Sequence, residues 1–219
     1  GCPSKSVAAS GSGAALIKTP DLAHAIVRAA RQGLEDWAGG QSIHSQGFKP
    51  SRIEFIHTLN HSRSGVPVVP RRLLPLSIKT RLGFDCVVVE RWVEHLLEAR
   101  PAAITLHGRT LQQMYRGAAD WSAIAEAAKL AHGTGTLMLG NGDLNTLVDA
   151  IRRAAESKVQ GVLVGRGTLG SPWFFREKEQ ARRAFSERDD LSTLPATAWE
   201  PPVSVSHRMQ VMLDHARQY

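Results

Sequence analysis

Two consecutive segments within residues 136–175 each read as a buried β-strand that ends in a glycine-rich turn. The first apolar run ends in Gly-Asn-Gly-Asp at residues 140–143, and the second ends in Gly-Arg-Gly at residues 165–167. Apolar residues recur at helical spacing over 144–157, and a second helix is expected after the second turn. Tandem units of this kind are what a (β/α)8 barrel uses to hold a phosphate after its last two strands.

The chemistry of the two turns favours an anionic ligand. Glycines let backbone N–H groups approach an anion closely, and the helix that follows a turn directs its positive end toward it. Arg166 adds a planar donor that stays charged. One such turn would fit any ordinary strand-to-helix connection, but two in tandem, the second with an arginine between glycines, predict a phosphate site.

The rest of the chain repeats the alternation of strands and helices. Strands are expected over 76–83 and 102–106, and helices over 22–34, 87–99 and 121–131. Strands separated by helices imply a parallel sheet with right-handed crossovers. Because four strands cannot close a barrel of eight, the α/β chain reads as the C-terminal part of a (β/α)8 TIM barrel.

The expected organisation has three parts. Residues 1–188 form a partial TIM-barrel catalytic domain, which ends in a charged helix from about Phe175 to Arg188. Residues 189–202 are a linker, and residues 203–219 begin a further amphipathic helix. Within the first part, residues 36–74 form an insertion of low regularity, with five Lys or Arg against two acidic residues. Its histidines lack the spacing of a metal site.

Three residues outside the turns are candidates for chemistry. Cys2 lies in a Gly-Cys-Pro turn and could be reactive, although a lone cysteine is more often inert. Lys79 shares one face of its strand with Arg81, so in a barrel both would point at a ligand, whereas in an open sheet they would be solvated. His107 follows a strand end, where barrel enzymes keep active-site residues; the alternative is a structural histidine that caps a turn.

The charge and composition of the chain indicate which kind of partner and which compartment to expect. The net charge is +7 and the pI is near 9.9, which favours an anionic partner, nucleic acid first. No apolar run reaches the roughly 18 residues of a membrane span. Cys2 and Cys86 are the only cysteines, which fits a reducing compartment; we expect the cytoplasm, with the nucleus and mitochondrion as alternatives. The chain does not begin with Met, so a preceding segment is expected.

Six blocks, in order, resemble the tRNA-dihydrouridine synthase family. They are GCP with a following Val, GSGAALIKTP, IKTRLGFD, ITLHGRTLQQMYRGAADW, LMLGNGDL and GVLVGRGTLGSPWFF. The resemblance implies a TIM barrel that carries FMN, followed by a helical domain that grips tRNA, of which 203–219 would be the start. It also implies that NADPH reduces FMN, that hydride passes to C6 of a tRNA uridine, and that a cysteine protonates C5.

The resemblance carries roles onto individual residues. Cys2 matches the proton-donating cysteine, Lys79 the lysine at the flavin ring, and His107 the histidine on the flavin side. Arg109 is a candidate for substrate or flavin contact. The two phosphate-gripping loops correspond to Asn141, Gly142, Asp143, Gly165 and Arg166. No metal is implied.

Two other functions stay open at this point. One is a flavin-dependent barrel oxidoreductase that acts on a small pyrimidine, and the other is an inactive RNA-binding remnant. The insertion is expected at the barrel's N-terminal face, away from the chemistry. Because the first strands of the family barrel have no counterpart here, we expect the 219-residue chain by itself to show weak activity or none.

Overall fold

The computed structural model describes residues 1–62, 71–174 and 203–218. Its centre is a parallel sheet of four strands in the order β1-β2-β3-β4. The strands are β1 (Ser77–Arg81), β2 (Ala103–His107), β3 (Leu137–Asn141) and β4 (Gly161–Leu163). The predicted α/β class and parallel sheet are therefore confirmed, and the four described strands form an open sheet.

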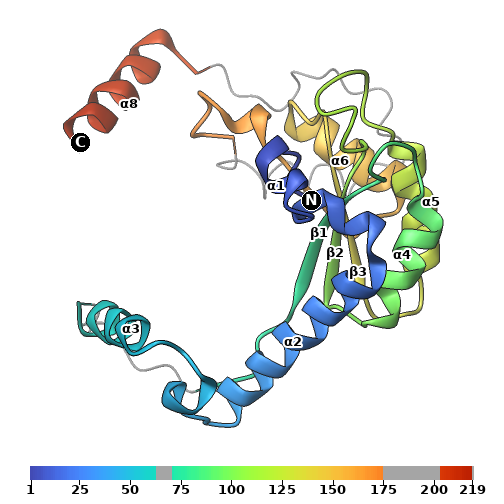
Figure 1. The fold of residues 1–219 in the computed structure, drawn as a ribbon. Coiled ribbons are helices and arrows are strands. Elements are labelled where there is room, and N and C mark those ends of the chain that lie inside the picture. Colours follow the sequence, from blue (N-terminus) through green and yellow to red (C-terminus); the bar gives the residue numbers. More distant parts are fainter. Residues whose placement is uncertain (63–70, 175–202, 219) are drawn as a thin grey trace.

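Three helices cover one face of this sheet (Figure 1). They are α4 (Val89–Glu98), α5 (Trp121–Ala131) and α6 (Leu147–Ser157). Between them and the strands lies a core of fully buried side chains, namely Leu82, Val93, Leu96, Ile104, Leu106, Ile124 and Met138. Helix α4 is also tied to β1 by a buried hydrogen bond of 3.0 Å from Trp92 Nε1 to Thr80 Oγ1.

Successive side chains along each strand point to opposite faces of the sheet, so one face carries the buried core and the other carries a different set of residues. Ile104 and Leu106 of β2 point into the core, so His107 belongs to the other face. The strand register then aligns the last residues of all four strands in one row, Arg81, His107, Asn141 and Leu163. Polar side chains far apart in the sequence thus meet at the carboxyl end of the sheet.

The N-terminal segment contains a short helix α1 (Lys5–Ala9), a 3-10 turn η1 (Gly13–Lys18) and the long helix α2 (Pro20–Ala38). Helix α2 begins with Pro20 at its first position, where the missing N–H group costs nothing. It extends four residues beyond the predicted end at residue 34. Figure 1 shows it running from the carboxyl end of the sheet toward the opposite end.

The insertion over 36–74 is more regular than the sequence indicated. It contains a 3-10 turn η2 (Ile43–Gln46) and a helix α3 (Pro50–Ser62), so the expectation of low regularity is wrong for these residues. The helix escaped detection because its apolar residues do not gather on one face, and only Ile53 is buried. Helix α3 lies near the amino-terminal end of the strands, as expected for the insertion (Figure 1).

The C-terminal part departs from expectation at one point. The glycine turn after β4 leads into a single 3-10 turn, η3 (Arg166–Thr168), instead of the α-helix that was expected directly after it. The predicted helix over 175–188 and the linker over 189–202 lie outside the described residues. Helix α8 (Val205–Arg217) agrees with the predicted final helix.

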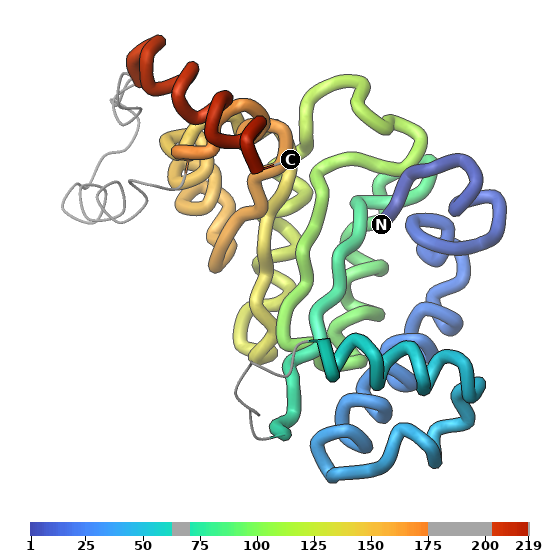
Figure 2. The backbone as a smooth tube through the Cα atoms, turned by 90° about the vertical axis from the view of Figure 1, so that its left-hand side faces the viewer, coloured from blue at the N-terminus to red at the C-terminus, as the bar shows by residue number. Residues whose placement is uncertain are grey.

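Helix α8 lies beside the chain that follows β4 (Figure 2). The Arg208 guanidinium stands 5.3 Å from the centroid of the Trp173 ring, and the His207 ring is 6.1 Å from the same ring. No helix in the described part of the chain is long and apolar enough to cross a bilayer.

Candidate active site at the carboxyl end of the sheet

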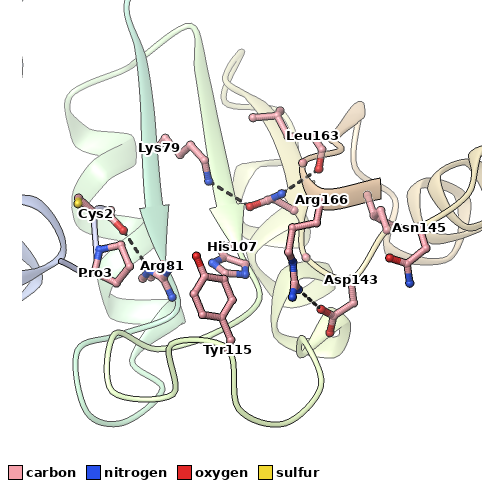
Figure 3. A pocket seen from close by; sticks show the side chains of 15 residues that line it. Cys2, Pro3, Lys79, Arg81, His107, Tyr115, Asp143, Asn145, Leu163 and Arg166 are labelled. Carbon is pink, nitrogen blue, oxygen red and sulfur yellow. Dashed lines mark hydrogen bonds and ion pairs between the residues drawn. The ribbon is translucent and has the colours of Figure 1, made fainter. Parts of the chain in front are cut away.

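A cavity of about 390 Å³ opens at the carboxyl end of the strands. Figure 3 shows that the residues that line it come from all four strands, from the loops that follow them and from the N-terminal segment. Eight residues singled out in the sequence line this one cavity, namely Cys2, Lys79, His107, Asn141, Gly142, Asp143, Gly165 and Arg166. The strand register brings most of them together, because all except Cys2 and Lys79 end or follow a parallel strand, and Lys79 lies within β1 two residues before its end.

Lys79 is held in place by a chain of hydrogen bonds across the sheet. Its Nζ donates to Asn141 Oδ1 at 3.1 Å, and Asn141 Nδ2 donates to the Leu163 carbonyl at 2.8 Å. These two bonds fix which end of the Asn141 amide faces which partner. Burial, followed by the charge of Arg81, lowers the pKa of Lys79 below its usual value. The cavity thus presents an ammonium group in a fixed position.

His107 is neutral at physiological pH. Burial, then the nearby charges of Arg81 and Lys79, lowers its pKa to about 4. A neutral imidazole can offer one donor and one acceptor to a ligand without adding charge.

The pKa of His107 makes stability depend on pH. Between about pH 6.5 and pH 4, His107 is protonated in the unfolded chain but stays neutral in the folded chain. Because protonation thus stabilises only the unfolded chain, the free energy of unfolding falls as the pH falls through this window. The loss is at most about 3 kcal/mol, and smaller because the side chain keeps some solvent contact. Urea unfolding at about pH 7 and about pH 4.5 measures it.

The matched variants are His107→Asn, which cannot titrate, and His132→Asn at an exposed position. His107→Asn should reduce the pH dependence of the free energy of unfolding, whereas His132→Asn should leave that dependence as in the wild type. An equal pH dependence in the wild type and His107→Asn would contradict the assignment.

Asp143 is the centre of an ion-pair network. Its Oδ2 accepts from Arg109 Nη2 at 2.6 Å and from the Ala119 N–H at 2.7 Å, and its Oδ1 pairs with Arg166 Nη2 at 3.1 Å. Burial raises the pKa of Asp143, but these hydrogen bonds and the two guanidinium charges outweigh it and lower the pKa below its usual value. The carboxylate therefore stays charged and orients Arg166.

Unlike the other candidate site residues, Arg109 lies outside the lining of the cavity. Its side chain is only 3% exposed. Besides Asp143, it donates to the Gly117 carbonyl at 2.5 Å. Arg109 thus reaches the cavity through Asp143, as a residue that positions the first glycine loop.

Backbone conformation at the first loop requires special residues. Gly142 has φ +133°, and a Cβ there would come within 2.6 Å of Ala119 Cβ, so only glycine fits without a shift. Asp143 follows with φ +50°, in the left-handed region. Such conformations persist where surrounding contacts hold them. Here one such contact is the 3.1 Å hydrogen bond from Trp121 Nε1 to the Gly142 carbonyl.

The second loop carries an accessible cation. The Arg166 side chain is 60% exposed, and its guanidinium lies 5.2 Å from the centroid of the Tyr115 ring. Gly165 lines the cavity, and a Cβ built on it would meet no atom within 4 Å, so there is open space beside the backbone. The two loops therefore combine backbone and guanidinium donors, as an anion requires.

Cys2 reaches the cavity from the N-terminal segment. Its thiol is free and exposed, and its carbonyl accepts the Ala14 N–H at 3.2 Å, which ties it to η1. Next to it, the Gly1 carbonyl accepts from Arg81 Nε at 3.0 Å. The turn is thus fixed to the end of β1, and Cys2 is one of the residues that line the cavity.

Three polar residues that line the cavity were not among the candidate site residues: Arg81, Tyr115 and Asn145. The shared strand face of Lys79 and Arg81 was a usable signal for the first. Tyr115 and Asn145 lie in loops without periodicity, so no pattern pointed to them. Among the described residues, no group of three or more His, Cys, Asp or Glu could hold a metal ion.

The chain is similar to known proteins over nearly all of its length. The model of the family described as dihydrouridine synthase matches residues 1–36 and 61–218, and so leaves out 37–60. A probable tRNA-dihydrouridine synthase of Aquifex aeolicus is 40% identical over 109 residues, which cover 50% of this chain and 34% of the relative.

Two further relatives match a larger share of this chain at lower identity, and their names are similar. A probable tRNA-dihydrouridine synthase 2 of Bacillus subtilis is 30% identical over 197 residues, 89% of this chain and 48% of the relative. A protein of Xenopus tropicalis named tRNA-dihydrouridine(47) synthase (NAD(P)(+))-like is 33% identical over 123 residues, 54% of this chain and 19% of the relative. The chain thus spans about half or less of these relatives. With its cavity and both glycine loops inside the matched residues, the chain belongs to the dihydrouridine synthase family.

Proposed function

We propose that this chain carries the catalytic cavity of an FMN- and NADPH-dependent enzyme that reduces uridine to 5,6-dihydrouridine in tRNA. The observation that carries the proposal is one cavity that combines the Cys2 thiol, the Lys79 ammonium and two glycine loops with Arg166. The names of the relatives, which are tRNA-dihydrouridine synthases, support the substrate.

The residues present fit FMN. Lys79, Arg81 and Arg166 make the wall cationic, which suits a ligand with a phosphate. The phosphate would be held by Gly142 and by Gly165-Arg166, and the backbone at Gly165 has open space beside it for close approach. Lys79 and His107, deeper on the strands, would face the flavin ring.

When bound and reduced by NADPH, FMN supplies the hydride that adds to C6 of the uracil, chemistry that no side chain can provide. Cys2 donates its thiol proton to C5, so that the base gains one hydride and one proton, and the thiolate regains a proton from water. A thiol is mostly protonated at neutral pH and can act as this acid. The Lys79 ammonium offers positive charge to the anionic reduced cofactor.

We propose the same three-part domain organisation that the amino-acid sequence predicts. Residues 1–188 would form the catalytic part, 189–202 the linker, and 203–219 the start of the helical part that holds tRNA. Support comes from α8, which carries His207, Arg208, His215 and Arg217 on an exposed helix. The basic balance of the chain, +7, suits the phosphate backbone.

Conversion of uridine in tRNA tests the proposal. Because weak activity is expected, the 219-residue chain is used in excess over unmodified tRNA, with FMN and NADPH, and a gain of about two mass units per site is measured by mass spectrometry. Reduction of free uracil but not of tRNA would favour a small-pyrimidine enzyme. Binding of tRNA without reduction, even by a version joined to the remaining barrel strands of a relative, would indicate an RNA-binding remnant.

Arg166→Ala tests the phosphate site. FMN and riboflavin differ only in the phosphate, so the variant should bind FMN roughly 10- to 100-fold more weakly and riboflavin equally well, as expected for one lost charge-assisted contact. Quenching of flavin fluorescence measures both affinities. Arg153→Ala, at an exposed pair with Glu156 on α6, is the matched control. Equal losses for FMN and riboflavin would contradict a phosphate contact.

A further inference from the structure

The insertion holds a second cavity, remote from the first. We call residues 37–62 the insertion arm; the family model leaves 37–60 of it unmatched. In the arm, η2 and α3 fold back against the end of α2 and enclose about 730 Å³. Figures 1 and 2 both place α3 toward the amino-terminal end of the strands, opposite the Cys2 end. The cavity is therefore a feature added to the family fold, apart from its catalytic centre.

Flat rings line this second cavity. Trp37 is 41% exposed and Phe48 is 46% exposed, so both rings offer free surface. The rings of His44 and His57 stack with their centroids 5.7 Å apart and their planes at 28°. Exposed rings cost solvation in a folded protein and are suited to stacking against a planar ligand.

An unpaired amide lies among these rings. Asn60 lines the cavity, and its side-chain amide makes no hydrogen bond with the part of the chain that the structure describes. Its neighbours are occupied: Asp36 Oδ1 accepts from Gln32 and Gln41, and Arg71 donates to the carbonyls of Trp37 and Gln41. A free amide offers two donors and one acceptor, which match the edge of a nucleobase.

The charge around the cavity suits a phosphodiester. Lys49 and Arg52, both exposed, lie next to Phe48 in the arm, and Arg71 contributes to the wall. Against them stand Asp36, already hydrogen-bonded, and Glu54. Rings interleaved with cations are the arrangement that proteins use to hold single-stranded nucleic acid.

We propose that the insertion arm is a second RNA-binding site, which takes an unpaired nucleotide of single-stranded RNA. The base stacks on an exposed ring, Asn60 hydrogen-bonds its edge, and the basic residues contact the backbone. An unpaired nucleotide is required because paired bases present neither a face nor a complete edge. The site uses neither FMN nor Cys2, so the proposal does not depend on the proposed reaction.

Fluorescence anisotropy of labelled RNA tests this in the absence of FMN and NADPH. The 219-residue chain should bind an unstructured ten-nucleotide RNA more tightly than a fully paired duplex of equal length. Phe48→Ala and Asn60→Ala should each weaken binding roughly 5- to 100-fold. Thr58→Ala is the matched control, because Thr58 lies on α3 but does not line the cavity. Circular dichroism checks that each variant is folded.

Two results would overturn the proposal: affinity of the single strand unchanged in folded Phe48→Ala and Asn60→Ala, or equal affinity for the single strand and the fully paired duplex. Binding of AMP with no binding of the ten-nucleotide RNA would assign the cavity to a free nucleotide instead. Sedimentation that shows self-association abolished by Phe48→Ala, without RNA binding, would assign the arm to contacts between copies. If the tRNA reduction assay fails while the single strand binds as expected, only the proposed reaction falls.

Discussion

Replacement of Cys2 by alanine should lower the single-turnover rate of uridine reduction in tRNA roughly 100- to 10,000-fold, the usual contribution of a positioned general acid. The physical reason is that C5 of the base would have to take its proton from water. Flavin affinity should not change, because the turn is held by backbone groups that the substitution leaves intact: the Cys2 carbonyl is bonded to η1 and the Gly1 carbonyl to Arg81 of β1.

Cys86→Ala is the matched control. Cys86 is the other free and exposed cysteine, and it does not line the cavity at the carboxyl end of the sheet. Its replacement should leave the rate unchanged. The rate is followed by mass spectrometry of tRNA under excess protein, and flavin affinity by fluorescence. Reduction at the wild-type rate in Cys2→Ala would remove the thiol from the mechanism, whatever the flavin affinity.

Replacement of Trp121 by alanine should destabilise the fold by about 3–5 kcal/mol, as expected for a large buried ring. Trp121 is 7% exposed and forms the start of α5. Its ring packs so closely on β3 that a Cβ on Gly140 would lie 2.4 Å from it. Its Nε1 also holds the Gly142 carbonyl, so FMN affinity should fall together with stability.

Trp121→Phe separates the two roles of this side chain. The phenyl ring keeps most of the packing, but the Gly142 carbonyl loses its donor, which should cost about 1–3 kcal/mol. Leu169→Ala, at a position 78% exposed, should change stability by less than about 0.5 kcal/mol. Urea unfolding measures all three. A loss below about 1 kcal/mol in Trp121→Ala would show that α5 does not support the first glycine loop.

Local patterns predicted the elements around the catalytic cavity. The helix predicted from about Trp121 to Ala131 has those bounds in the structure. There Asp120 caps it by accepting the Ala123 N–H at 2.9 Å. His107 was expected directly after a strand and is the strand's last residue. Where the pattern was absent, as in α3, the prediction failed.

The roles of charged residues were decided by packing. Arg109 was a candidate for ligand contact, yet its guanidinium is buried against Asp143, 34 residues away. Arg81 was seen only as a charge beside Lys79, yet it is 5% exposed and bonds the Gly1 and Thr110 carbonyls. In both cases the partner comes from a distant segment, so no local pattern could name it.

The sequence by itself determined the alternation of parallel strands and helices, the two glycine turns and the residues at the strand ends, because these depend on side-chain periodicity and backbone freedom along a few residues. Only the tertiary structure decided which of those residues share one cavity. The register across β1 to β4 aligns Arg81, His107, Asn141 and Leu163, and desolvation inside that row lowers the pKa of His107 to about 4. The distances between segments and the removal of water from His107 arise only when the chain packs, so no short stretch of the sequence predicts them.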